Sequence, residues 1–330
     1  MNHPERVRVI EQFLATHGFS LRDARPLAQD ASFRRYLRLK GGAVLMDAPP
    51  PEDITPFVHI ATHLTGAGLS VPRILAADPA DGLVIEEDLG DDLFSSIIPR
   101  HDADLLFDAA IDALIVMHRA APASGLPAWG CTEMRATALG TLFDWWWPAM
   151  HGAPPPPDAR AEITDALETI LAPIETGPRS LAHRDFFAGN LLWLPERNGP
   201  RRVGIIDFQS AAIGHPAYDL VSLAQDARQD IPAAWEERAV ARYLAARPEL
   251  DPGMFRAAYA ACAAQRHLRV ACQWVRLAKR DSRPQYLVHG PRTWRLLTRA
   301  LTDPAVAPLA AALDRWLPPE QRRNPPGCTA

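Results

Sequence analysis

The sequence predicts an α+β protein built as two lobes. Residues 1–88 are expected to form a small antiparallel sheet with helix, and residues 89–330 a mostly helical lobe. Short apolar runs separated by Gly and Pro turns fill the first third of the chain, and long stretches with helical apolar spacing fill the rest. At 330 residues and 48% hydrophobic content, the chain is long and apolar enough for two such lobes.

In the first lobe, residues 1–17 predict an amphipathic helix, with Val7, Ile10, Phe13 and Leu14 on one face. Gly41 and Gly42 predict the turn of a β-hairpin. The remaining turn signals and apolar runs predict strands at residues 24–29, 34–40, 43–47, 73–77 and 83–87 and a helix at 56–65.

Residues 86–90 mark the expected hinge between the lobes, because helical patterns begin after them. Helices are predicted at residues 103–119, 134–150, 158–174, 218–228, 235–246 and 254–279. Two short apolar runs, 191–193 and 203–206, predict a buried hairpin inside the helical lobe. The Pro- and Gly-containing tail, residues 322–330, is expected to be frayed.

Charge and composition favour a cytoplasmic protein with a small-molecule partner. The formal net charge is −4, from 35 Lys and Arg against 39 Asp and Glu. The chain therefore has no excess of positive charge that would indicate binding to nucleic acid. No apolar run reaches the roughly 18 to 20 residues that a membrane span needs. The four cysteines lack C-x-x-C spacing and are interpreted as free thiols. The oligomeric state is not predicted.

The strongest functional signal is one polar loop followed by an apolar run and a second carboxylate. His183, Asp185 and Asn190 form the pattern H-x-D-x-x-x-x-N, and Asp207 is followed by Phe208. Phosphoryl transfer needs a carboxylate that orients an acceptor hydroxyl, which suits Asp185 as the catalytic base. It also needs oxygen ligands for Mg²⁺ against the phosphates, which suits Asn190 and Asp207. His183 is interpreted as a packed structural residue.

This motif resembles the catalytic and metal-binding segments of the protein-kinase-like superfamily, in its aminoglycoside phosphotransferase and choline kinase branch. Further segments resemble bacterial anomeric amino-sugar kinases; they lie at residues 30–36, 46–50, 87–90, 206–209, 218–223 and 280–287. The resemblance implies a bilobal kinase-like fold, ATP and Mg²⁺ as cofactors, and phosphorylation of the C1 hydroxyl of N-acetylmuramate and N-acetylglucosamine in cell-wall recycling.

Within that resemblance, nucleotide-binding roles fall on two segments. Ser32, Arg34 and Arg35 lie where the superfamily's phosphate-covering loop lies, although a solvated hairpin with exposed arginines would have the same sequence. The backbone of Glu87, Asp88 and Leu89 would form hydrogen bonds with the edge of the adenine ring. Asp219 would accept hydrogen bonds from the catalytic-loop backbone. Met46 stands where most kinases place a phosphate-binding lysine, so either an arginine of the loop or Mg²⁺ would have to replace that charge.

Substrate contacts are expected from Gln209 and from two helices, with Glu133, Arg135, Asp144, Arg266 and Arg269 as the candidates. Arg266 and Arg269 share a helix face, where they would pair either with a carboxylate of the substrate or with acidic helices. Three adjacent tryptophans, 145–147, cannot all face one ligand on a helix, so core packing is favoured for them.

Three other functions remain open at this level. The scaffold would also suit a kinase of another small alcohol, such as an aminoglycoside, choline or homoserine, although arginines on the substrate helix disfavour a cationic acceptor. Met46 would fit a nucleotide-binding pseudokinase, which the intact Asp185, Asn190 and Asp207 disfavour. A protein kinase is disfavoured because no peptide-positioning segment is recognisable.

Overall fold

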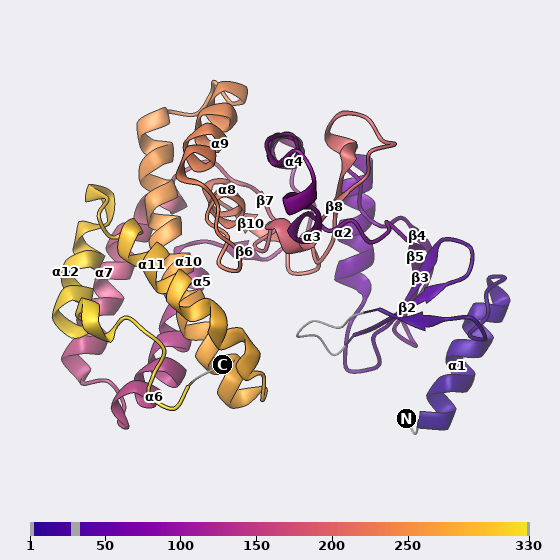
Figure 1. The fold of residues 1–330 in the computed structure, drawn as a ribbon, viewed down its shortest axis with the longest axis horizontal. Coiled ribbons are helices and arrows are strands. Elements are labelled where there is room, and N and C mark those ends of the chain that lie inside the picture. Colours follow the sequence, from indigo (N-terminus) through magenta and orange to yellow (C-terminus); the bar gives the residue numbers. More distant parts are fainter. Residues whose placement is uncertain (1–2, 28–33, 329–330) are drawn as a thin grey trace. The chain divides into compact units, whose positions relative to one another are not determined.

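The computed structural model describes residues 3–27 and 34–328 and forms an α+β protein (Figure 1). The chain folds into two compact units. The first contains Met1–Met117 and Gly189–Ser210, and the second contains His118–Ala188 and Ala211–Ala330. The predicted α+β class is confirmed, because an antiparallel sheet dominates the first unit and helices dominate the second. The lobe boundary between residues 88 and 89 stays a prediction.

The first unit is built on an antiparallel five-stranded sheet with strand order β1-β2-β3-β5-β4. Its strands are β1 (Arg25–Pro26), β2 (Arg35–Leu39), β3 (Ala43–Asp47), β4 (Ile74–Asp78) and β5 (Leu83–Glu87). Its helices are α1 (His3–Thr16), α2 (Thr55–Gly66), α3 (Phe94–Ile97), η1 (Ile98–Arg100), most of α4 (Ala103–Arg119) and η4 (Gly199–Arg202). Both Gly41 and Gly42 have positive φ, which allows the tight turn predicted between β2 and β3.

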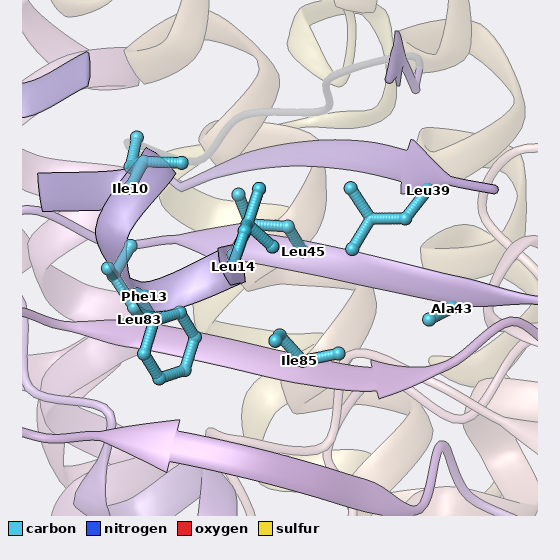
Figure 2. Close-up of a cluster of buried hydrophobic side chains, with 8 residues drawn as sticks. All are labelled: Ile10, Phe13, Leu14, Leu39, Ala43, Leu45, Leu83 and Ile85. Atoms are coloured by element: carbon cyan, nitrogen blue, oxygen red, sulfur yellow. The ribbon is translucent and has the colours of Figure 1, made fainter. Parts of the chain in front are cut away.

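Helix α1 covers one face of this sheet. Figure 2 shows its apolar side chains against those that β2, β3 and β5 direct to the same face; the cluster comprises Ile10, Phe13, Leu14, Leu39, Ala43, Leu45, Leu83 and Ile85. Because successive strand residues point to opposite faces, Met46 and Glu86 lie on the face away from α1. Helix α2 lies on that other side (Figure 1).

The predicted hairpin is confirmed as β8 (Leu191–Trp193) paired antiparallel with β9 (Val203–Ile205). It belongs to the first unit and not, as the sequence predicted, to the helical part of the chain. The physical reason is that Gly204 forms a parallel bridge with Ser70, and the Ile205 N–H donates to the Ser70 carbonyl at 2.8 Å.

The second unit is a helical assembly with a small sheet of order β6-β10-β7. Its strands are β6 (Ala128–Trp129), β7 (Ser180–Ala182) and β10 (Ala212–Gly214). Its longer helices are α5 (Cys131–Thr141), α6 (Trp147–His151), α7 (Pro157–Glu175), α8 (Ala217–Ala224), α9 (Ala233–Ala246), α10 (Pro252–Arg280), α11 (Gly290–Ala300) and α12 (Ala307–Trp316). Short helical turns lie at η3 (Ala188–Asn190), where the chain returns to the first unit, and at η5 (Pro284–His289), η6 (Pro304–Val306) and η7 (Pro319–Gln321).

Two predictions for the second unit were wrong in detail. The helix expected at 134–150 is interrupted by a π-helix, η2 (Leu142–Trp146), which turns Trp146 and Trp147 into the core. The tail expected to be frayed is packed as far as residue 328. The Trp146 indole N–H donates to the Arg323 carbonyl at 3.0 Å, and the Asn324 amide donates to the Leu287 carbonyl at 2.8 Å.

Across residues 3–27 and 34–328, no helix combines the length and the apolar character needed to cross a bilayer.

Replacing Leu14 by Ala should lower the free energy of unfolding by about 2–5 kcal/mol, because the fully buried side chain leaves a cavity between α1 and the sheet. The matched control is Leu75→Ala, at a side chain 47% exposed, which should cost less than about 0.5 kcal/mol. Urea denaturation followed by circular dichroism measures both. Equal losses in the two variants would contradict the packing described for α1.

Candidate active site

The loop that carries Asp185 begins where β7 ends and is held by one buried carboxylate. Asp219, fully buried in α8, accepts hydrogen bonds from the backbone N–H groups of His183 at 2.6 Å and Arg184 at 2.8 Å. Arg184 has a φ of 76°, a left-handed conformation that non-glycine residues rarely adopt. The two hydrogen bonds to Asp219 therefore stabilise the sharp turn that presents Asp185.

A second layer of buried groups holds Asp219 itself. The Nε2 of His118 lies 3.3 Å from the Asp219 carboxylate, and its Nδ1 lies 2.8 Å from the Tyr243 hydroxyl. Burial lowers the pKa of His118, which favours the neutral ring that donates to Asp219 and accepts from Tyr243. Arg247 donates to the same Tyr243 oxygen at 3.0 Å. These partners give the buried carboxylate further support.

Asp185 lies between buried neighbours but keeps its own side chain 43% exposed. Its backbone N–H donates to the His183 imidazole at 3.3 Å, and the next two residues, Phe186 and Phe187, are buried. Burial alone would raise the pKa of the Asp185 carboxyl, but the charges of the arginines Arg266, Arg269 and Arg184 hold it below its ordinary value. Asp185 is therefore an ionised hydrogen-bond acceptor at neutral pH.

Asn190 and Asp207 meet in the first unit because they flank the β8–β9 hairpin. Antiparallel pairing of Leu191 with Ile205 brings the residues just outside the hairpin close together. The Ile206 N–H donates to the Asn190 carbonyl at 3.1 Å, and the Asn190 amide nitrogen lies 3.3 Å from the Asp207 carboxylate. Gln209 donates to the other Asp207 oxygen at 2.7 Å.

Phe208 anchors the Asp207 side of this pair. Asp207 has a φ of 63° and is exposed, whereas Phe208 is fully buried and stacks on Phe57 of α2, with ring centroids 4.8 Å apart. The left-handed backbone at Asp207 is a strained arrangement of the kind that clusters at functional sites. Packing of Phe208 thus fixes the direction of the carboxylate.

The Asn190–Asp207 pair suits a hard cation that brings most of its own ligands. No group of three or more His, Cys, Asp or Glu side chains gathers as a metal cage within residues 3–27 and 34–328. Mg²⁺ prefers oxygen ligands and keeps several waters or phosphate oxygens, so one carboxylate and one amide oxygen are a fitting protein contribution.

The expected hinge residues are paired through their side chains. Glu87 bonds Arg197 at 2.7 Å and Arg73 at 3.2 Å, and Asp88 bonds Arg38. The backbone N–H and carbonyl of Leu89, by contrast, make no hydrogen bond within the described part of the chain. The backbone N–H and carbonyl of Leu89 are therefore available to form hydrogen bonds with a ligand.

Arg34 and Arg35 point to opposite faces of the sheet, and Ser32 lies outside the described residues. Arg35 pairs with Asp47, which also binds Arg6 of α1 at 2.6 Å. Arg34 is buried; its guanidinium carbon lies 6.0 Å from the centroid of the Phe57 ring, and its Nε lies 3.4 Å from a Glu52 oxygen. The sequence offered either arginine as a phosphate contact, and the structure directs their side chains to opposite faces of the sheet.

Around Arg34 lie groups whose ionisation it influences. Burial raises the pKa of the Glu86 carboxyl to about 8, and the charge of Arg34 opposes this rise. Burial also raises the pKa of the Tyr36 hydroxyl, with smaller contributions from the charges of Glu86 and Asp207. Arg34, Tyr36, Glu86 and Asp207 are therefore electrostatic neighbours in the first unit.

The other substrate candidates divide into two groups. Arg266 of α10 lies 3.8 Å from the Asp185 carboxylate, and Arg269 donates to the Tyr218 hydroxyl at 3.2 Å. Glu133 accepts from the Gly130 N–H at the start of α5, Arg135 pairs with Glu168 of α7, and Asp144 is exposed. The contacts of Glu133 and Arg135 are explained by helix capping and helix packing.

Sequence reasoning missed several residues of the catalytic-loop environment: His118, Trp129, Arg184, Tyr218 and Tyr243. Arg184 sits in the motif itself, directly before Asp185, and its guanidinium carbon lies 3.9 Å from the centroid of the Trp129 ring. Tyr218 directly precedes Asp219 in the segment 218–223, so the positions of Arg184 and Tyr218 were the available signals. His118, Trp129 and Tyr243 lie far from the motif in sequence and reach the loop only through the tertiary fold.

Comparison with known proteins fits this geometry. The family described as "Phosphotransferase enzyme family" matches residues 23–253, more than half of the chain. This chain belongs to that family. It is an ATP-dependent phosphotransferase, and the predicted enzyme class is confirmed.

This phosphotransferase is 39% identical to the N-acetylmuramate/N-acetylglucosamine kinase of Caulobacter vibrioides, over 97% of this chain and 99% of that protein. The protein of the same name from Pseudomonas aeruginosa is 37% identical, over 87% of each chain. A crystal structure of a choline/ethanolamine kinase family protein from Mesorhizobium loti aligns with a TM-score of 0.63. It has 17% identity and covers 94% of this chain and 99% of that one, so it shows the fold alone.

Replacing Arg266 by Gln should raise the pKa of the Asp185 carboxyl, because the substitution removes the positive charge that contributes most to holding this pKa low. Carboxyl ¹³C NMR titration measures the shift, with Asp185→Asn used to assign the resonance. Arg256→Gln removes the same charge at the exposed start of α10, where Arg256 pairs with Glu237, and should leave the pKa unchanged. An unshifted Asp185 in the Arg266 variant would contradict the electrostatics described here.

Proposed function

We propose that this phosphotransferase transfers the γ-phosphate of ATP to the C1 hydroxyl of an N-acetylated amino sugar, N-acetylmuramate or N-acetylglucosamine. Two relatives named N-acetylmuramate/N-acetylglucosamine kinase, which match 87–97% of the chain at 37–39% identity, support this choice of acceptor. The observation that carries the chemistry is Asp185, an ionised carboxylate on a loop fixed by Asp219. Such a reaction would serve cytoplasmic recycling of cell-wall sugars.

In this proposal Asp185 accepts a hydrogen bond from the C1 hydroxyl and receives its proton. The C1 oxygen forms a bond to the γ-phosphorus while the bond from that phosphorus to the β–γ bridging oxygen breaks, and ADP leaves. An anomeric hydroxyl is more acidic than an ordinary alcohol, so a carboxylate with a low pKa is a sufficient base. Asn190 and Asp207 would hold Mg²⁺, which supplies charge neutralisation to the phosphates.

The nucleotide would be held by residues of the first unit. Leu89 presents a backbone donor and acceptor to the adenine edge, next to Glu87 and Asp88. Arg34 supplies a phosphate-binding charge that the uncharged Met46 cannot. Arg34 lies on the face of the sheet away from α1, and its charge acts on Tyr36, as the charge of Asp207 does. Ser32 remains a proposed phosphate contact from the sequence.

Charge near Asp185 favours a sugar over the alternative acceptors. Three arginines, Arg184, Arg266 and Arg269, act on the Asp185 carboxyl. A polycationic aminoglycoside or the quaternary ammonium of choline would be repelled by these charges.

The proposed function is tested by an acceptor panel assayed for ADP formation with N-acetylmuramate, N-acetylglucosamine, kanamycin and choline. ATP consumption should depend on the amino sugars. Asp185→Asn should lower kcat by about 10²- to 10⁴-fold, because the acceptor hydroxyl loses its base, while ATP affinity is kept. Asp207→Asn should instead weaken Mg-ATP binding. Turnover with kanamycin or choline alone, or full activity of Asp185→Asn, would refute the proposal.

Arg34→Gln should raise the KM for ATP by about tenfold or more, because a charged hydrogen bond to phosphate is lost. Arg35→Gln is the matched control. It removes the same charge one residue along, from a side chain that pairs with Asp47 on the α1 side of the sheet, and should leave the KM for ATP within about twofold. If the two variants behave alike, Arg34 does not replace the strand lysine.

A further inference from the structure

Two arginines of α10 whose charges act on Asp185 have buried hydrogen-bond donors without an acceptor among the described residues. Arg266 is 3% exposed, and both its Nε and its Nη1 are buried without a hydrogen-bond acceptor in the described part of the chain. The nearest Asp185 oxygen lies 3.8 Å from Nη1, which is too long for a hydrogen bond. A buried guanidinium N–H left unpaired is costly, so this side chain is arranged for a ligand.

Arg269, one turn along the same helix, shows the same feature. Its Nη2 donates to the Tyr218 hydroxyl at 3.2 Å, and its Nε is buried without an acceptor among the described residues. The fully buried Tyr218 also lies beneath Arg266, whose guanidinium carbon is 5.7 Å from the Tyr218 ring centroid. Tyr218 therefore fixes both guanidinium groups relative to Asp185.

Apart from Asp185, which carries one negative charge against two arginines, the nearby carboxyl groups do not neutralise this pair. Asp219 is occupied by backbone donors and His118. Asp226 acts electrostatically on Arg266, but it is buried against the backbone N–H of Arg228 at 2.7 Å, and burial raises its pKa. The ligand that fits is an anion, and the planar guanidinium fork matches a carboxylate especially well.

We propose that Arg266 and Arg269 bind a carboxylate carried by the acceptor sugar and thereby favour N-acetylmuramate over N-acetylglucosamine. The inference rests on the proposed function and names the group that selects between its two acceptors. N-acetylmuramate differs from N-acetylglucosamine by a lactyl ether that ends in a carboxylate. This carboxylate would accept hydrogen bonds from the unpaired N–H groups of Arg266 and Arg269 and would hold the sugar beside Asp185.

The test compares kcat/KM for the two sugars near neutral pH in the wild type and in Arg266→Gln and Arg269→Gln. Each variant should lose about 10- to 100-fold more with N-acetylmuramate than with N-acetylglucosamine, because any effect of the lost charge on Asp185 lowers both values alike. Arg256→Gln, which removes a charge from the same helix where it pairs with Glu237, should change neither value. An equal loss with both sugars would overturn the inference, because the arginines would then act on Asp185 or on the transferred phosphate.

Binding without ATP gives a second, independent readout. Isothermal titration should show that N-acetylmuramate binds the wild type more tightly than its methyl ester, and that Arg266→Gln removes the difference. If the wild type phosphorylates neither sugar, the proposed function fails, but the titration still decides this inference. Equal affinity for the acid and the ester would overturn it.

Discussion

The catalytic loop depends on the buried carboxylate of Asp219. Its two oxygens receive the backbone N–H groups of His183 and Arg184, so the chain can turn through the left-handed conformation at Arg184. A carboxyl group so deeply buried is stable only when its hydrogen bonds are complete, and His118, itself held by Tyr243, supplies the remainder. The direction in which Asp185 points follows from this network.

The candidate residues divide the chemistry by charge. Around Asp185, arginines lower the pKa of its carboxyl group, and their charges would favour an anionic acceptor. Around Asp207, acidic and amide oxygens suit a cation, and buried Arg34 adds one positive charge. The residues proposed for phosphoryl transfer lie in the motif of residues 183–208, whereas the acceptor would be chosen by α10, which lies outside that motif. This separation explains how relatives of one fold can act on different alcohols.

Local sequence patterns predicted the central sheet well. Strands β3 and β5 were predicted at their observed bounds, because each is a short apolar run ended by turn signals. Asn190 and Asp207 were predicted together from the motif and from the oxygen ligands that Mg²⁺ prefers, and the register of the β8–β9 hairpin is what brings them together. Arg266 and Arg269 were recognised as sharing a helix face from their spacing alone.

Long-range contacts decided what the sequence could not show. The helix predicted at 218–228 ends at Ala224, and Gln225 then joins a buried network with His267 and Glu236. Alternation placed Arg34 and Arg35 on opposite faces, but only the docking of Arg6 onto Asp47 shows which face is closed by α1. The packed tail likewise depends on a hydrogen bond from Trp146, more than a hundred residues away in sequence.

The position of the phosphate in the product tests the central claim most directly. Phosphorus–proton correlation NMR of the wild-type reaction with ATP and N-acetylmuramate or N-acetylglucosamine identifies the carbon that carries the new phosphate. Our account predicts coupling between the phosphorus and the anomeric proton. Coupling to a proton of any other carbon, or release of free phosphate without a sugar phosphate, would contradict it.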